Sequence, residues 1–230
     1  MKKYLLIVIC TATFFNTAFS QEKKVPLKDM RDSLSYSIGI SMGESLLRTD
    51  IDNINQAVFF EALRQKINNE ETLWDMSKAD SLLVGYIMGK RQAKAEENKA
   101  KGEAFLAENA KRDEVYTTPS GLQYEMLKMA EGPRPSLYST VKCLYRGTTI
   151  DGEVFDENWN RENPIEFKVM DMIDGWVEGL QMMPIGAKWK LYIPSDLAYG
   201  ERGAGRAVGA NETLIFEIEL LEIVSTDKPE

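Results

Sequence analysis

Five residues in the C-terminal half of the chain have side chains that could form an aromatic pocket containing one carboxylate. They are Tyr145, Phe155, Asp156, Trp176 and Tyr199. Such a pocket suits an uncharged, apolar substrate, because the rings supply apolar surface and the polar groups supply only a few hydrogen bonds. The chain contains no histidine, which excludes an imidazole base, a Ser-His-Asp triad and a histidine-ligated metal. Chemistry at these residues must therefore come from shape, exclusion of water and hydrogen bonding.

The charge pattern and the motifs exclude several other classes of protein. The chain has 36 acidic and 28 basic residues, and its basic residues are interspersed with acids instead of forming a stripe. Nucleic-acid binding needs a basic face, so no nucleic-acid partner is expected. The sequence has no phosphate-binding loop, no G-x-G-x-x-G motif and no cluster of metal ligands, and it therefore implies no cofactor.

Residues 1–20 have the features of a signal peptide. Lys2 and Lys3 form a basic start, residues 4–15 form an apolar run too short to cross a bilayer, and residues 18–20 form a small-x-small cleavage site. The protein is therefore expected to be exported to the periplasm. No later apolar stretch is long enough for an integral membrane span in the mature chain.

The two cysteines, Cys10 and Cys143, have different expected fates. A lipid anchor on Cys10 is an alternative to cleavage after Ser20, but the bulky Ile9 immediately before the cysteine disfavours it. Cleavage after Ser20 would leave Cys143 without a partner for an internal disulfide. Because no histidine or second cysteine is present to activate it, Cys143 is expected to be a small apolar strand residue and not a nucleophile.

Residues 28–75 are expected to form a helical dimerisation domain. Apolar residues at four-residue intervals over residues 34–46 predict one amphipathic helix, and a strong apolar face over residues 55–67 predicts another. Gly39 and Gly43 flank the first apolar face, and they indicate either the close approach of a second helix or simply a weaker helix. Both helices are too short to bury their apolar faces alone, so a homodimer formed through them is expected.

Residues 76–112 are expected to form one long connecting helix, with Ser77 as its N-cap and Asp80 three residues later. Over residues 90–101 the only apolar residues are alanines, and charges lie all round the helix. This part of the helix is therefore predicted to be surrounded by water. Two apolar residues at positions 105 and 106 are expected to anchor the helix near the next domain.

Residues 116–226 are expected to form a domain of short strands with one helix, which is the α+β class. Strands are predicted at residues 122–127, 141–145, 164–169, 187–194 and 214–221. In the fourth of these, Trp189, Leu191 and Ile193 share one face, so the sheet is predicted to be antiparallel with one face buried. Helical spacing over residues 170–180 predicts one short helix that covers the buried face.

The motifs in this last domain carry a family resemblance. They are Tyr145-Arg146-Gly147, Phe155-Asp156, Gly175-Trp176 and Ala198-Tyr199-Gly200. With them, residues 116–224 resemble an FKBP-type peptidyl-prolyl isomerase domain, and the whole mature chain is similar to the exported bacterial isomerases of the macrophage infectivity potentiator type. The resemblance implies an FKBP-like antiparallel sheet wrapped on a short helix, preceded by an all-α dimerisation region and a long connecting helix. It implies cofactor-free isomerisation of prolyl bonds in unfolded or exported polypeptides, in a pocket of the kind that binds macrolide inhibitors.

The resemblance also implies roles for individual residues. Trp176 would form the floor of the proline pocket, and Tyr199 would donate its hydroxyl to a substrate carbonyl. Asp156 would fix Tyr145 while facing the rotating carbonyl, and the backbone N–H of Ile173 would hold a second carbonyl. The other lining residues would be Phe155, Phe167, Met172 and Phe216.

Two segments depart from the family pattern. Ile165 stands where many relatives have an aromatic residue, and residues 206–211 replace a run that commonly contains Ile-Pro-Pro. Ile165 and Val208 are apolar and are expected to form the pocket rim, whereas the loop without prolines is expected to be more mobile. Substrate preference and macrolide affinity are the properties that these departures affect.

Two classes of function stay open on the residues alone. The first is an enzyme that interconverts cis and trans prolyl bonds, and the second is a non-catalytic chaperone or binding module that holds unfolded chains in the same pocket. Singly, Trp176 could be a core residue, Asp156 a turn or capping acid, and Tyr199 a half-buried tyrosine. The presence of Asp156 together with Tyr199 favours the enzyme.

Overall fold

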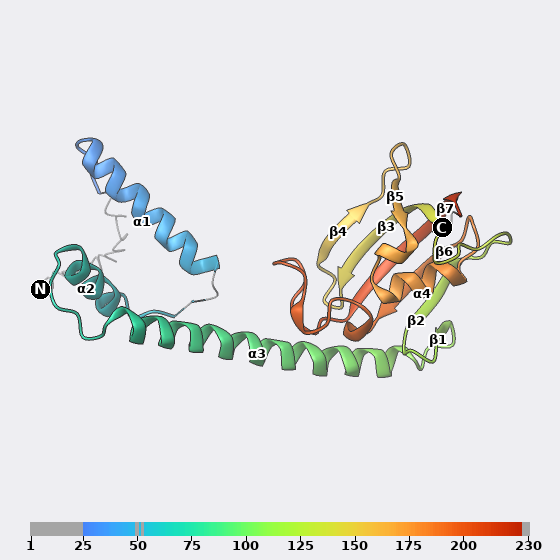
Figure 1. Cartoon of the computed structure of the whole chain (residues 1–230), viewed down its shortest axis with the longest axis horizontal. Helices are drawn as coiled ribbons and strands as arrows, with labels where there is room; N and C mark the ends of the chain where they lie inside the picture. The colour runs from blue at the N-terminus through green and yellow to red at the C-terminus, as the bar shows by residue number, and fades with distance from the viewer. Residues whose placement is uncertain (1–24, 49–50, 52, 227–230) are drawn as a thin grey trace, which may run out of the picture. The chain divides into compact units, whose positions relative to one another are not determined.

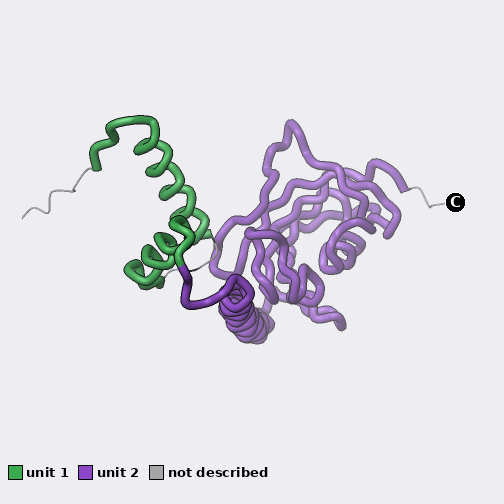
Figure 2. The backbone as a smooth tube through the Cα atoms, turned by 60° about the vertical axis from the view of Figure 1, so that its left-hand side comes forward, with its two compact units in different colours: residues 1–70 green, residues 71–230 purple. Residues whose placement is uncertain are grey.

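The computed structural model describes residues 25–48, 51 and 53–226 (Figure 1). The chain divides into two compact units, residues 1–70 and residues 71–230 (Figure 2). The predicted signal peptide, with its cleavage site and Cys10, lies outside the described residues.

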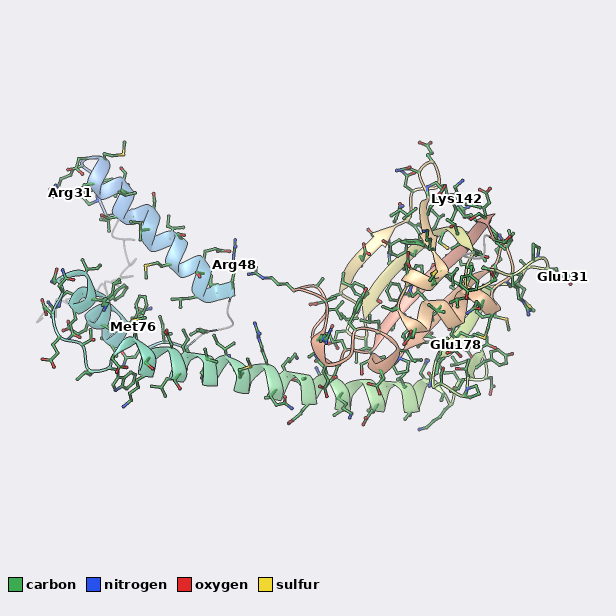
Figure 3. All side chains as sticks on the ribbon, viewed as in Figure 1. Arg31, Arg48, Met76, Glu131, Lys142 and Glu178 are labelled. Carbon is green, nitrogen blue, oxygen red and sulfur yellow. The ribbon has the colours of Figure 1, made fainter. Side chains whose placement is uncertain are left out.

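The described part of the first unit contains two helices, as the sequence predicts. Helix α1 spans Met30–Arg48, and α2 spans Gln56–Ile67 after an N-cap, Asn55, whose side chain accepts a hydrogen bond from the N–H of Val58 (3.3 Å). Neither helix contains a buried residue, and the side chains stand out from both of them (Figure 3). The apolar faces of α1 and α2 are therefore exposed.

The predicted close approach at the two glycines of α1 is not seen within the described residues. A Cβ atom added at Gly39 or Gly43 would meet nothing within 4 Å. These two positions are open, which leaves room for a partner helix from outside the described chain.

Helix α3 spans Met76–Asn109 and belongs to the second unit. Its N-cap is Asp75, whose side chain accepts from the N–H of Lys78 (2.8 Å). The prediction of Ser77 as the N-cap is therefore wrong. Asp75 already supplies a carboxylate two residues earlier, so Ser77 lies inside the first turn.

The prediction that residues 90–101 contact only water is also wrong. Four residues of α3 are buried, at spacings of three, four and seven, and we call them the α3 stripe: Ala95, Asn98, Gly102 and Asn109. The stripe faces the strand domain of the same unit, which comprises residues 115–226. Because it consists of small and amide residues, it carries no apolar signal, and the charges lie on the other faces of the helix.

The strand domain is a seven-stranded sheet in which every pairing is antiparallel. The strands are β1 (Val115–Thr117), β2 (Gln123–Lys128), β3 (Thr140–Thr149), β4 (Val154–Asn158), β5 (Ile165–Lys168), β6 (Lys188–Ile193) and β7 (Leu214–Ser225). Their order is β1-β2-β6-β7-β3-β4, and β5 pairs with β3 beside that path. The sequence predicted five of these strands and missed the short β1 and the polar β4.

One helix, α4 (Asp174–Met182), lies across one face of the sheet (Figure 1). Three short 3₁₀ helices complete the domain: η1 (Val169–Asp171), η2 (Ser195–Leu197) and η3 (Gly200–Arg202). The core forms between α4 and the sheet, where Trp176 and Leu180 pack among inward-facing strand residues such as Ile218. The predicted antiparallel sheet with a covering helix is thus confirmed.

The opposite face of the sheet is partly covered as well. Phe105 of α3 packs against Tyr192 of β6, with ring centroids 5.9 Å apart. Arg161 from the β4–β5 connection pairs with Glu219 of β7. Both contacts bury residues that strand alternation alone would place in water.

Cys143 lies fully buried on β3. Burial raises the pKa of its thiol to about 12, so the group is neutral at physiological pH. This agrees with the prediction of a small apolar strand residue.

Candidate active site

The predicted pocket residues form an aromatic cluster centred on Trp176. This side chain, on α4, is only 1% exposed. Its ring lies nearly perpendicular to those of Tyr145, Phe167 and Phe216, with centroid distances of 5.4, 5.5 and 5.2 Å. Edge-to-face contacts of this kind favour a fixed arrangement of rings. The sequence-predicted floor residue is therefore held from three sides.

Gly147 allows one further ring, that of Phe155, to join the cluster. Phe155 of β4 and Phe216 of β7 contact edge to face with centroids 5.4 Å apart. A Cβ atom at Gly147 would lie 2.6 Å from Phe155 and 2.7 Å from Phe216. A glycine between two flanking strands is thus required here. The sequence motif contained this glycine, and a glycine within a strand pattern often marks such a close approach.

Asp156 and Tyr145 form a hydrogen-bonded pair at the edge of the cluster. The antiparallel register of β3 and β4 brings them together, and the Tyr145 hydroxyl donates to Oδ2 of Asp156 (2.8 Å). Burial and, after it, this hydrogen bond raise the pKa of Tyr145 above its ordinary value, so the proton stays on the phenol. Asp156 is exposed, and its carboxylate remains accessible from solvent.

Tyr199 stands immediately before η3 and is 38% exposed. Burial, followed by the charge of Asp156, raises the pKa of its phenol. The hydroxyl is therefore protonated at neutral pH and can donate a hydrogen bond. Since no hydrogen bond of this hydroxyl occurs within the described residues, its proton is available to a ligand.

The start of α4 offers a second donor. Ile173 is the N-cap of α4, and its carbonyl accepts from the N–H groups of Trp176 (2.9 Å) and Val177 (3.0 Å). Within the described chain the N–H of Ile173 itself donates no hydrogen bond. Nε1 of Trp176 is buried and has no partner among the described residues either. Helix N-termini commonly leave backbone N–H groups, such as that of Ile173, free to bind a ligand.

The remaining predicted residues lie around this centre. Met172, Ile173, Phe155 and Phe167 are partly buried and pack against the core. Ile165, a predicted rim residue, is 37% exposed. Val208 is 2% exposed and packs inside the core, so its predicted place on the rim is not what the structure shows. A turn closed by hydrogen bonds between Ala204 and Val208 draws this side chain inward.

Neither a metal site nor a membrane span is seen in the part of the chain that the structure describes. Among residues 25–48, 51 and 53–226, no three Cys, Asp or Glu side chains gather as metal ligands would. Over the same residues, no helix combines the length and the hydropathy needed to cross a bilayer.

Comparison with known proteins gives matches along both halves of the chain. A family profile described as "FKBP-type peptidyl-prolyl cis-trans isomerase" matches residues 132–221. A second, "Domain amino terminal to FKBP-type peptidyl-prolyl isomerase", matches residues 31–126. The two profiles together extend from α1 to β7.

Individual relatives match over most of the chain. "Outer membrane protein MIP" of Legionella longbeachae is 37% identical, covering 97% of this chain and 98% of that protein. "Probable FKBP-type peptidyl-prolyl cis-trans isomerase FkpA" of Neisseria meningitidis serogroup B is 38% identical, covering 82% of this chain and 73% of that protein. The crystal structure of FkpA from Escherichia coli is 29% identical with a TM-score of 0.70, covering 88% of this chain and 100% of that chain. The chain belongs to the family of FKBP-type peptidyl-prolyl cis-trans isomerases.

Proposed function

We propose that this protein catalyses cis–trans isomerisation of prolyl peptide bonds in exported polypeptides while they fold. The observation that carries the proposal is the hydrogen bond between Tyr145 and Asp156 at the edge of the cluster centred on Trp176. It combines a rigid apolar floor with one accessible carboxylate. Family membership supports the same activity.

Bond rotation needs no group transfer. The barrier is about 20 kcal/mol, and rotation unaided takes roughly 10 to 100 s. The twisted amide has a less polarised carbonyl and a more pyramidal nitrogen than the planar amide. An apolar, dehydrated site favours the twisted form relative to water, which is differential binding of the transition state.

Three groups would hold the substrate during rotation. The Tyr199 hydroxyl would donate to one substrate carbonyl and the N–H of Ile173 to another, since both donors are available. Asp156, fixed by Tyr145, would face the rotating carbonyl. None of these roles transfers a proton, which agrees with a chain that has no histidine.

The direct test is a protease-coupled assay on a Phe-Pro or Leu-Pro peptide. We expect Asp156→Asn and Tyr199→Phe each to lower kcat/KM, with Asp156→Asn the larger because it acts where the carbonyl rotates. For Tyr199→Phe the loss should be about twofold to tenfold, the contribution of one hydrogen bond. Both variants should keep the thermal stability of the parental protein.

Matched controls remove the same groups elsewhere. Asp113→Asn removes an exposed carboxylate, and Tyr116→Phe removes an exposed hydroxyl, both outside the cluster. Each should keep the parental rate. Parental rates from both Asp156→Asn and Tyr199→Phe would refute the assigned roles. A folded parental protein with no isomerase activity would leave the second class of function, a module that only binds unfolded chains.

The first unit supports a further part of the proposal, a homodimer formed through α1 and α2. Both helices expose their apolar faces, and the space beside Gly39 and Gly43 is open. The mature chain should therefore give the mass of a dimer in light scattering at micromolar concentration. Ile38→Glu, on the apolar face of α1, should yield a monomer because a buried, unpaired charge is costly.

Ser37→Glu is the matched control for this experiment. Ser37 is on the polar side of α1, beside Ser33 and one turn before Ser41. The same charge placed there should leave the dimer intact. A monomeric parental chain, or equal effects of the two substitutions, would contradict assembly through this face.

Export and ligand preference complete the proposal. One relative is named an outer membrane protein, and both an outer-membrane and a soluble periplasmic location require export, for which residues 1–20 provide the signal.

Macrolide inhibitors would compete with the prolyl substrate. Because Ile165 is 37% exposed and Val208 only 2%, Ile165 would influence the affinity for macrolides more.

A further inference from the structure

The connection between β6 and β7 joins the candidate active site to helix α3. Tyr199 lies near its beginning and Asn211 near its end. The N–H of Asn211 donates to the carbonyl of Gly200 (2.8 Å), the residue directly after Tyr199. Asn211 has a φ of 57°, a conformation that few residues other than glycine adopt. The place of Tyr199 is therefore tied to the place of Asn211.

Two side-chain hydrogen bonds attach this connection to the α3 stripe. Nδ2 of Asn98 donates to the carbonyl of Ala210 (2.9 Å). In the other direction, Nδ2 of Asn211 donates to the carbonyl of Ala95 (3.4 Å). Helix and connection run side by side at this point (Figure 1). The bonds run both ways, so a shift of either segment along the other breaks both.

The composition of the stripe indicates that it fixes the position of the β6–β7 connection on α3, in addition to burying surface. Asn98 is 7% exposed, and a buried amide is unfavourable unless its hydrogen bonds are made in one particular geometry. At Gly102, a Cβ atom would lie 2.2 Å from Oγ1 of Thr213. At Gly102, α3 therefore approaches the end of the connection more closely than a residue with a side chain at position 102 would permit.

We propose that α3 positions Tyr199 for catalysis and that Asn98 is the positioning residue. Asn98 holds Ala210, the adjacent Asn211 holds Gly200, and Gly200 is bonded to Tyr199. The inference rests on the proposed role of Tyr199 as a donor to the substrate. A hydrogen bond weakens steeply with distance and angle, so a small displacement of this hydroxyl reduces its contribution.

The test is a double-mutant cycle on the mature chain, with kcat/KM measured on a Leu-Pro peptide. Asn98→Ala should lower kcat/KM by about twofold to tenfold and by no more than Tyr199→Phe does, because the loss cannot exceed the contribution of the Tyr199 hydrogen bond. In a Tyr199→Phe background no hydroxyl is left to misplace, so Asn98→Ala should cause no further loss. A change that acted only on stability would not show this dependence. Lys99→Ala, at the exposed neighbouring position of α3, is the control and should keep the parental value.

Amide hydrogen exchange at Asn211 reports on the connection without reference to activity. Asn98→Ala should accelerate this exchange, and Lys99→Ala should not. An inactive parental protein would overturn the proposed function and this inference with it. If the parental protein is active and sensitive to Tyr199→Phe, then a parental kcat/KM for Asn98→Ala overturns the inference alone. The inference alone is also overturned if Asn98→Ala lowers kcat/KM by the same factor in the Tyr199→Phe background as in the parental protein.

Asn211→Gly covers the case in which Asn98→Ala does not fold. Glycine adopts the backbone conformation of residue 211 without strain, and the substitution removes only the bond to Ala95. Its effect on kcat/KM should have the same direction and be smaller, because that bond is the longer of the two. Parental kcat/KM together with parental exchange at residue 211 would then overturn the inference.

Discussion

Replacing Trp176 by alanine should lower the free energy of unfolding by about 3 to 5 kcal/mol and remove measurable isomerase activity. The side chain is 1% exposed and contacts three perpendicular rings, so its removal leaves a cavity that the rigid cluster cannot close. A loss of this size is a large part of the total stability of a typical domain. Urea denaturation followed by far-ultraviolet circular dichroism measures it.

Trp159→Ala is the matched control for this prediction. Trp159 lies in the β4–β5 connection and is 37% exposed, and the ammonium group of Lys188 lies over its ring, 4.8 Å from the centroid. A partly exposed cation–π contact contributes about 0.5 to 1 kcal/mol, so this variant should lose about 1 kcal/mol or less. Equal losses at Trp159 and Trp176 would show that the cluster is not the stabilising centre of the domain.

The fold was predictable where apolar residues follow a clear period. The alternation in β7 and the helical spacing around Trp176 each indicate one buried face, and burial decides both elements. The three-residue β1 and the polar β4 carry no such period. They exist because longer neighbours, β2 and β3, offer them an edge to pair with.

The membership of the candidate site could also be predicted, since its motifs are made of distinctive aromatic residues. Its geometry could not, because the contact of Tyr145 with Asp156 depends on the register between two strands. The position of Val208 could not be predicted from the sequence either. An apolar residue in a loop suggests a rim, but the hydrogen bonds to Ala204 turn it into the core.

The α3 stripe escaped prediction for a different reason. Hydrophobic periodicity detects helix faces through apolar residues, whereas this face consists of Ala95, Asn98, Gly102 and Asn109. Small residues and buried amides bind through close approach and hydrogen bonds, which depend on what lies opposite. Amide and glycine residues spaced three, four and seven apart within a charged helix were the available signal.

Removal of α3 should cause the second large effect, a loss of stability in the strand domain. A chain that begins at Val115 should unfold with a free energy about 3 to 6 kcal/mol lower than one that begins at Lys90. The shorter chain loses the hydrogen bonds of Gln123 to Asn109 and to the carbonyl of Leu106, both 2.9 Å long. It also loses the stripe's bond to Ala210 and uncovers Tyr192.

Urea denaturation of the two truncated chains measures this difference, and the peptide assay adds a second readout. Both chains keep every residue of the aromatic cluster, so a purely local site would give them equal kcat/KM values. We expect the chain that begins at Val115 to be both less stable and less active, because Ala210 and Asn211 then have no helix to hold them. The chain that begins at Lys90 should match the full mature protein in kcat/KM on a short peptide. Equal stabilities of the two truncated chains would mean that α3 only connects the units, and the contacts of Asn98 and Asn109 would then contribute nothing measurable to the domain that they touch.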